Sequence, residues 1–222
     1  MRLTAEDHQL VTEAVAAAER GTDGEIVTIV ARGSDAYHDA ALHWARLAVL
    51  LVPAALALMP GVAHRLSEPL GGGWGEPSTG ALLVAMLVLQ AVAFLVVRAA
   101  LAYRPLRLAL TPRATKARRV RARARALFAA AAEHRTAART GVLLYLSLGE
   151  HRAEIVADAA IHGRVAPDIW GEAMAAMIPE LRAGRPGAGM AAAVARIGVV
   201  LAEHFPKTES DVNELPDRLI EL

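Results

Sequence analysis

Two apolar stretches organise this chain of 222 residues: LAVLLVPAALALMPGVA (Leu47–Ala63) and GALLVAMLVLQAVAFLVV (Gly80–Val97). Each approaches the roughly 20 apolar residues that a helix needs to cross a bilayer. The rest of the chain is too short to cover two helices that are apolar all round within a soluble core. We therefore predict a transmembrane hairpin over residues 41–103, with helices at about 45–63 and 80–98, in which the polar Gln90 faces the partner helix.

Basic residues predict how this hairpin is oriented. The loop between the apolar stretches, residues 64–79, contains Arg65 as its one Lys or Arg, whereas Arg98–Arg125 contains ten basic residues and no acidic one. Because Lys and Arg accumulate on the cytoplasmic side of membrane proteins, we predict a multi-pass protein of the bacterial inner (cytoplasmic) membrane. Both termini and the soluble domain are then cytoplasmic.

The basic run also indicates a partner. Juxtamembrane Lys and Arg attract anionic lipid at about 1 kcal/mol per residue. Nucleic acid is the rival partner, but the run lacks interleaved aromatic residues, and the net charge of the chain is only +1, so we expect no nucleic-acid binding. The residues expected to contact lipid headgroups are Arg104, Arg107, Arg113, Lys116 and Arg118.

The amino-acid composition excludes several kinds of functional site. The chain has no cysteine, which excludes disulfides, a thiolate nucleophile and a Cys-type zinc site. Hydrophobic residues make up 55% of the chain but aromatic residues only 4%, a balance that favours helix-rich packing with small side chains.

The piece before the hairpin, residues 1–34, predicts one helix and one strand. Thr4 and Asp7 have the spacing of a capping box, and Gly21 is placed to end the helix. GEIVTIVARG (Gly24–Gly33) is a short run rich in β-branched residues, the pattern of a strand buried on both faces. One strand is not stable alone, so its neighbours must lie elsewhere in the chain.

The piece after the hairpin, residues 111–205, supplies those neighbours. We predict a basic helix from Thr111-Pro112, with an apolar stripe at Val120, Ala124, Leu127, Phe128 and Ala131. We also predict a strand at Gly141–Leu148, a turn at Gly149-Glu150, and an antiparallel strand at Arg152–Asp158. Glu150 and His151 are interpreted as polar residues of this turn. Two further helices are predicted to start near Pro167 and Pro186. Residues 206–222 read as a polar tail with one amphipathic turn. The predicted fold is α/β: a small mixed β-sheet flanked by helices, with the transmembrane hairpin inserted after the first strand. A hairpin returns the chain to the side it left, so the insertion costs little beyond loop closure.

Four segments of these pieces resemble the TPM domain family, and more narrowly its bacterial membrane-bound subgroup. They are TDGEIVTIV (Thr22–Val30), GVLLYLSLGEHR (Gly141–Arg152), EIVAD (Glu154–Asp158), and HFP with NELPD (His204–Pro206 and Asn213–Asp217). The resemblance implies an α/β fold. It also implies a range of roles, because family members are associated with photosystem repair or receptor accessory functions, and acid phosphatase activity and calcium binding have been proposed for a few.

Acidic residues near strand ends suggest one candidate site. Asp158 ends the third predicted strand, His162 and Asp168 follow it, and Glu25 opens the first strand. Strand ends next to loops often hold ligands, and these groups suit a phosphoryl group or a divalent cation such as calcium or magnesium. In the structural alternative, Asp168 offsets a helix dipole and Asp158 caps its strand.

A second cluster lies just before the first apolar stretch. Asp35, His38, Asp39 and His43 share one face if they are helical. That face suits either a metal ion or a solvated surface near the membrane.

Three functions are compatible with these patterns. The first is a non-enzymatic accessory or interaction module at the membrane, whose partners are lipid and another membrane protein. The alternative is a metal-dependent phosphatase that acts through the acidic site at the end of the third strand. The third is a lipid-responsive sensor that uses the basic run.

Overall fold

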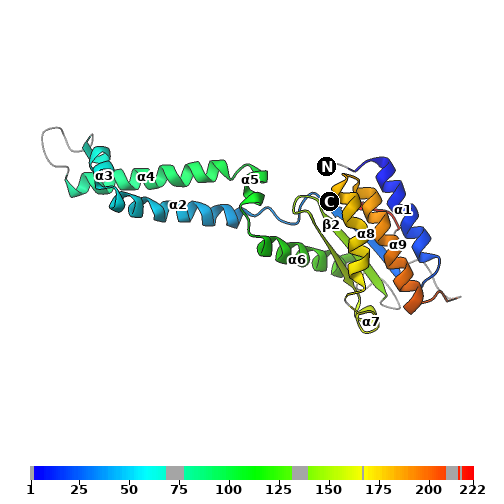
Figure 1. Cartoon of the computed structure of the whole chain (residues 1–222). Helices are drawn as coiled ribbons and strands as arrows, with labels where there is room; N and C mark the ends of the chain where they lie inside the picture. Colours follow the sequence, from blue (N-terminus) through cyan, green and yellow to red (C-terminus); the bar gives the residue numbers. More distant parts are fainter. Residues whose placement is uncertain (1–2, 69–77, 132–139, 167, 209–214, 216) are drawn as a thin grey trace. The chain divides into compact units, whose positions relative to one another are not determined.

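The computed structural model describes residues 3–68, 78–131, 140–166, 168–208, 215 and 217–222. The chain forms two compact units (Figure 1). One consists of Met1–Asp35 together with Arg113–Leu222, and the other is Ala36–Pro112. The two pieces that flank the apolar stretches therefore fold together as one unit, which contains the sheet.

The sheet has four strands in the order β3-β2-β1-β4. β1 (Glu25–Ala31) pairs in parallel with β2 (Gly141–Ser147), and β2 pairs antiparallel with β3 (Arg152–Ala157). The predicted mixed α/β sheet flanked by helices is confirmed. The tail adds an unpredicted strand, β4 (Ile220–Glu221), which runs parallel to β1 beside Ile29 and Val30.

Three helices cover one face of the sheet: α1 (Ala5–Glu19), α8 (Trp170–Arg182) and α9 (Pro186–His204). The predicted capping box of α1 is confirmed, with the Asp7 amide donating to Thr4 Oγ1 at 3.1 Å and the Thr4 amide donating to Asp7 Oδ2 at 2.8 Å. α9 packs closely on α1 at Gly198, where an added Cβ would lie 2.5 Å from the Cβ of Ala18.

α6 (Arg113–Ala131) covers the other face. Its predicted apolar stripe is confirmed at Val120, Ala124 and Phe128, which pack against β1 and β2. Because helices cover both faces, every residue of β1 and β2 is buried, as a strand without polar alternation predicts.

The connection after β3 differs from expectation. A short helix, α7 (Ala159–His162), follows the strand directly, and α8 begins at Trp170. Pro167, where the sequence predicts that helix to start, lies outside the described residues.

The second unit contains α2 (His38–Leu58), α3 (Pro60–Ser67), α4 (Thr79–Ala100) and α5 (Arg104–Ala109). α2 begins earlier than the sequence suggests and ends at Leu58, because the following proline starts a separate helix. α2 and α4 pack along each other. Gln90 Nε2 donates to the Val49 carbonyl at 3.2 Å, which confirms that Gln90 faces the partner helix.

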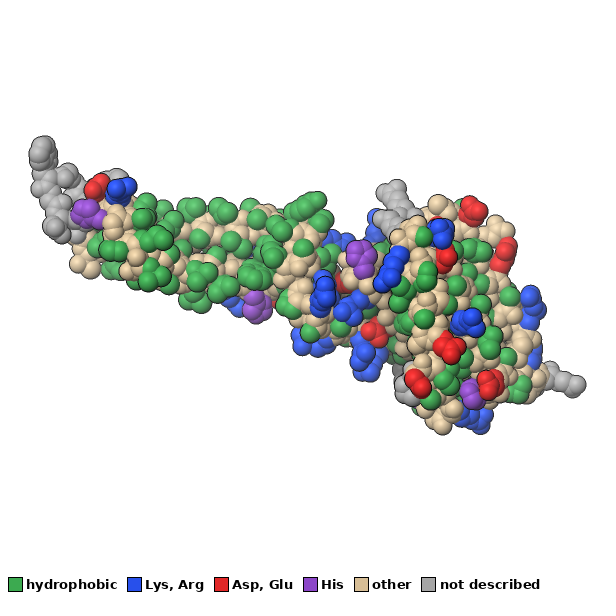
Figure 2. All heavy atoms as spheres, viewed as in Figure 1, with side chains coloured by type: hydrophobic (Ala, Val, Ile, Leu, Met, Phe, Trp, Pro, Cys, Tyr) green, Lys and Arg blue, Asp and Glu red, His purple; other side chains and the backbone are tan. Residues whose placement is uncertain are grey.

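Apolar side chains cover the outside of this unit (Figure 2). Leu50, Leu58, Leu87 and Leu95 are 68%, 82%, 61% and 64% exposed. Within the described residues, α2, α4 and α9 are long and apolar enough to cross a membrane, and 17%, 6% and 50% of their apolar windows are buried. α9 differs from the other two because Met190, Val194, Ile197 and Leu201 fill the core beside the sheet.

Candidate functional site

A buried polar network fixes the end of the sheet at which β1 and β2 finish. The Glu150 carboxylate, which is 6% exposed, accepts hydrogen bonds from the Ser34 amide at 3.0 Å and from the Ser147 hydroxyl. Ser34 Oγ donates to Ser147 Oγ at 3.0 Å and lies 3.0 Å from the Tyr145 hydroxyl. The hydroxyls therefore form a chain from Tyr145 through Ser34 and Ser147 to the Glu150 carboxylate, which compensates for burying its charge.

This network holds the β2–β3 turn against the segment that follows β1. His151, in the turn just before β3, has a φ of 50° in the left-handed region, a conformation that costs free energy for residues other than glycine. Its side chain is exposed. The turn is therefore a fixed structure, and the sequence, which reads Glu150 and His151 only as polar turn residues, does not reveal this.

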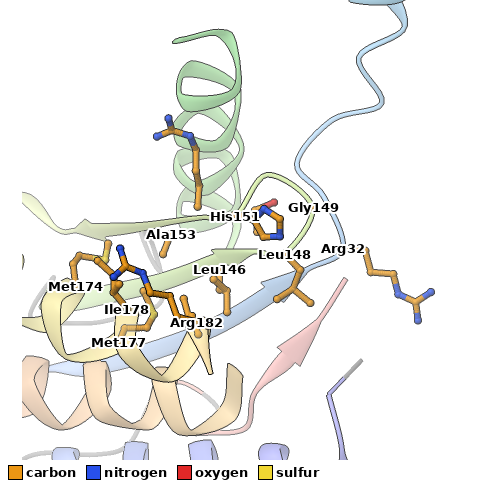
Figure 3. Close-up of a pocket in the computed structure, with 13 residues that line it drawn as sticks. Arg32, Leu146, Leu148, Gly149, His151, Ala153, Met174, Met177, Ile178 and Arg182 are labelled. Atoms are coloured by element: carbon orange, nitrogen blue, oxygen red, sulfur yellow. The ribbon is translucent and has the colours of Figure 1, made fainter. Parts of the chain in front are cut away.

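A groove of about 900 Å³ lies beside this turn, between the sheet and α8 (Figure 3). Most of its lining is apolar, and Figure 3 shows the α8 side chains facing the strands that carry Leu146 and Ala153. A partly open, mainly apolar cavity with a few polar groups is the usual form of a binding site. Its apolar lining residues are Leu146, Leu148, Ala153, Met174, Met177, Ile178 and Leu181.

The ionisable side chains of the groove are basic. Among the described residues that line it, none is acidic, while Arg32, His151, Arg152 and Arg182 all contribute. Arg32 lies 3.8 Å from Glu221 of β4, and Arg152 donates to the Arg113 carbonyl of α6 at 3.4 Å. Arg182 is exposed and makes no ion pair with the described residues.

The predicted acidic site belongs to the opposite end of the sheet. Asp158 is 6% exposed, and its Oδ2 accepts a hydrogen bond from the Gly141 amide at 3.0 Å. Asp158 thus connects the end of β3 to the start of β2. This role resembles the structural alternative given by the sequence, in which Asp158 caps its strand. Glu25, 5% exposed, starts β1 opposite Gly141 in the register.

The other members of that site lie at the surface. His162, at the end of α7, and Asp168, just before α8, are both exposed. Within the described ranges, no three acidic or histidine side chains come together in a way that could hold a metal ion. Glu25 and Asp158 therefore share one end of the sheet, but the four residues do not converge as a metal centre.

The second predicted cluster is also dispersed. α2 begins at His38, so Asp35 precedes the helix and is not on a shared face. Asp35 instead pairs with Arg119 of α6 at 2.6 Å. His43 Nδ1 lies 2.6 Å from the Asp39 carbonyl, an interaction within the helix.

The residues expected to contact lipid belong to two helices. Arg104 and Arg107 are on α5, where Arg107 Nη1 donates to the Leu101 carbonyl at 3.0 Å. Arg113, Lys116 and Arg118 occupy the first two turns of α6. Arg104, Arg113 and Arg118 are exposed and the other two are half-buried.

Comparison with known proteins supports the fold. A family profile described as the TPM domain matches residues 105–200. The NMR structure of BA42 protein from the psychrophilic bacterium Bizionia argentinensis is similar to this chain, with a TM-score of 0.57 and 18% identity, over 100% of this chain and 97% of that one. No curated protein matches the chain. At this level of identity, the structural similarity concerns the fold alone.

Proposed function

From the premise that this chain carries a TPM domain, we propose that it is a membrane-anchored, non-enzymatic interaction module of the bacterial cytoplasmic membrane. The single observation that carries the anchoring is the exposed apolar surface of α2 and α4. Leu58 and Leu50 are 82% and 68% exposed, and soluble monomers rarely expose contiguous apolar patches of this kind. A bilayer would cover these side chains.

The basic residues near the ends of this unit support the orientation. Arg65 is the one Lys or Arg between Leu58 and Arg98, whereas α6 alone contains seven basic residues and no acidic one. By the positive-inside rule, the folded unit lies in the cytoplasm and the segment between α3 and α4 lies outside. The exposed Arg113 and Arg118 then contact anionic headgroups.

Cysteine labelling tests the topology directly, because the chain has no cysteine of its own. Glu68→Cys marks the end of α3 and Glu13→Cys marks α1, and both positions are exposed. In intact spheroplasts, a membrane-impermeant maleimide should label Glu68→Cys and should reach Glu13→Cys only after lysis. Extraction of the wild-type chain by alkaline carbonate, or equal labelling of the two variants before lysis, would contradict the anchoring and the orientation respectively.

The non-enzymatic assignment rests on how Asp158 is used. Its carboxylate accepts a hydrogen bond from the backbone of β2. His162 and Asp168 are exposed, and among the described residues they form no cluster that could hold a metal ion. The detergent-purified full chain should not release phosphate from p-nitrophenyl phosphate with added calcium, magnesium or manganese. Hydrolysis that Asp158→Asn abolishes, with the circular dichroism spectrum unchanged, would instead establish the phosphatase.

A further inference from the structure

β3 is an edge strand, with no other strand of the described sheet on its outer side. The Asp158 amide donates to the Gly141 carbonyl at 3.0 Å, so this pair belongs to the hydrogen-bonded set of the antiparallel ladder. Because hydrogen-bonded pairs alternate along such a ladder, Ala153, Ile155 and Ala157 direct their N–H and C=O groups away from β2. In the described part of the chain, none of these groups has a backbone partner.

This edge has little of the usual protection against strand pairing. Natural edges are often blunted by charged side chains, proline, a bulge or a very short strand. β3 carries Arg152 and Glu154, but neither has its backbone N–H and C=O directed outward. β3 instead has six residues in unbroken register with β2, and the residues with outward backbone groups are Ala, Ile and Ala. By contrast, β4 at the other edge has only two residues.

The groove lies directly beside this edge. Ala153 of β3 lines it, as do Met174, Ile178 and Arg182 of α8 (Figure 3). These three α8 residues are spaced four apart and therefore share one helix face. Ile178 is 43% exposed. A strand added to β3 would direct every second side chain towards this face of α8.

Charge indicates what kind of strand fits. Arg182 and the exposed His151 line the groove, and none of its described lining residues is acidic. A second copy of this chain could also pair through β3, related by a twofold axis that places the same face of each copy side by side. The seven basic residues of one α6 would then lie towards those of the other, and their charges would repel. An acidic segment would complement these charges instead.

We propose that β3 and the α8 groove bind an extended segment of a partner protein as a fifth strand, with apolar side chains towards Met174 and Ile178 and an acidic side chain at Arg182. Backbone hydrogen bonds supply affinity in this mode of recognition, and the groove supplies specificity. The inference rests on the proposed function as an interaction module and names the chemistry of its partner.

Selection from a random 12-residue phage-displayed peptide library tests this, with the full chain held in nanodiscs of zwitterionic lipid. Ile155→Pro removes an outward N–H and no bond to β2, so the edge should still fold. Ile155→Lys keeps the backbone and blunts the edge with charge, which covers the case in which the proline variant does not fold. Ile155→Val is the matched control, and circular dichroism and thermal melting check each variant.

The expected peptides alternate apolar residues and carry at least one Asp or Glu. Their affinity should fall by on the order of tenfold or more in Ile155→Pro and Ile155→Lys, the effect of losing one or more net hydrogen bonds, and should be unchanged in Ile155→Val. Arg182→Glu should reverse the selected charge. Failure to enrich any peptide, binding that both edge variants retain, or a wild-type dimer that Ile155→Lys dissociates would overturn the proposal.

These outcomes are separable from the test of the proposed function. A chain that is anchored and oriented as expected but selects no edge-dependent peptide refutes only the strand-addition site. Edge-dependent peptides selected by a chain that carbonate extracts would refute only the membrane anchor.

Discussion

Replacing Glu150 with alanine should destabilise the sheet-containing unit more than its position in a surface turn suggests. The carboxylate is 6% exposed and accepts hydrogen bonds from the Ser34 amide at 3.0 Å and from the Ser147 hydroxyl. Alanine would leave the buried Ser147 hydroxyl and the half-buried Ser34 amide without this acceptor. The turn would also lose its connection to the segment after β1.

The size of the effect follows from these two bonds. A hydrogen bond to a charged group contributes about 1.5–3 kcal/mol, and the relief of burying the carboxylate offsets part of the loss. We expect Glu150→Ala to lower the free energy of unfolding by about 3 kcal/mol. Glu150→Gln keeps one acceptor oxygen and the shape of the side chain, so the expected loss is about 1 kcal/mol.

Urea titration of the detergent-solubilised chain measures this loss. Trp170, which is 9% exposed and packs in the core, reports unfolding in a background that carries Trp44→Phe and Trp74→Phe. Glu172→Ala is the matched control, because Glu172 is exposed on α8 and such substitutions change stability by about 0.5 kcal/mol or less. A Glu150→Ala midpoint equal to that of the control would refute the network as a structural tie.

Three further outcomes are expected from the same titration. Gly198→Ala should lower the free energy of unfolding by about 1–3 kcal/mol. The added Cβ would lie 2.5 Å from the Cβ of Ala18, so α9 would have to move away from α1. An unchanged urea midpoint would contradict this packing. Arg185 donates a 2.7 Å hydrogen bond to Glu180, which holds the pKa of that carboxyl below its ordinary value. The resulting stabilisation is present above the unfolded-state pKa and is lost as the pH falls through the lower folded-state pKa. Glu180→Gln should therefore weaken the acid dependence of the urea midpoint. A pH profile identical to that of the wild type would show that the pair does not stabilise the fold. Asp158→Ala should lower the free energy of unfolding by about 1–3 kcal/mol, because the first amide of β2 loses its acceptor. Asp158→Asn keeps an acceptor oxygen and should be closer to wild type. If Asp158 had a purely chemical role, neither substitution would change the stability.

Local patterns predicted most of the sheet and its helical cover. β1, β2 and β3 were predictable because unbroken apolar runs and a Gly-Glu turn are properties of neighbouring residues. The capping box of α1 and the stripe of α6 were predictable for the same reason. β4 was not, because a strand of two residues in a polar tail carries no periodic pattern, and its place beside Ile29 and Val30 depends on long-range pairing.

The candidate sites were predicted less well, and the residues show why. Asp158 stands out in the sequence as a carboxylate at a strand end. Its carboxylate, however, accepts a hydrogen bond from a backbone amide of the neighbouring strand, and a sequence motif does not predict such a contact. Ser34 and Glu150 are 116 positions apart, and the parallel register of β1 and β2 brings them together. The Ser-x-x-Glu spacing of Ser147 and Glu150 was the one local signal for this network, and by itself it does not indicate a partner at Ser34.

The tail also determines which edge of the sheet remains open. Because β4 pairs with β1, the edge of β1 is covered at Ile29 and Val30. Leu219 packs into the core beneath α1 and α9, and Leu215 packs into the core beneath α6, so the tail is fixed to both faces of the sheet. Pairing with a partner strand is therefore directed to β3, next to the basic groove. The same 17-residue tail that looks like an appendage in the sequence thus leaves β3 as the edge at which the domain can recognise another protein.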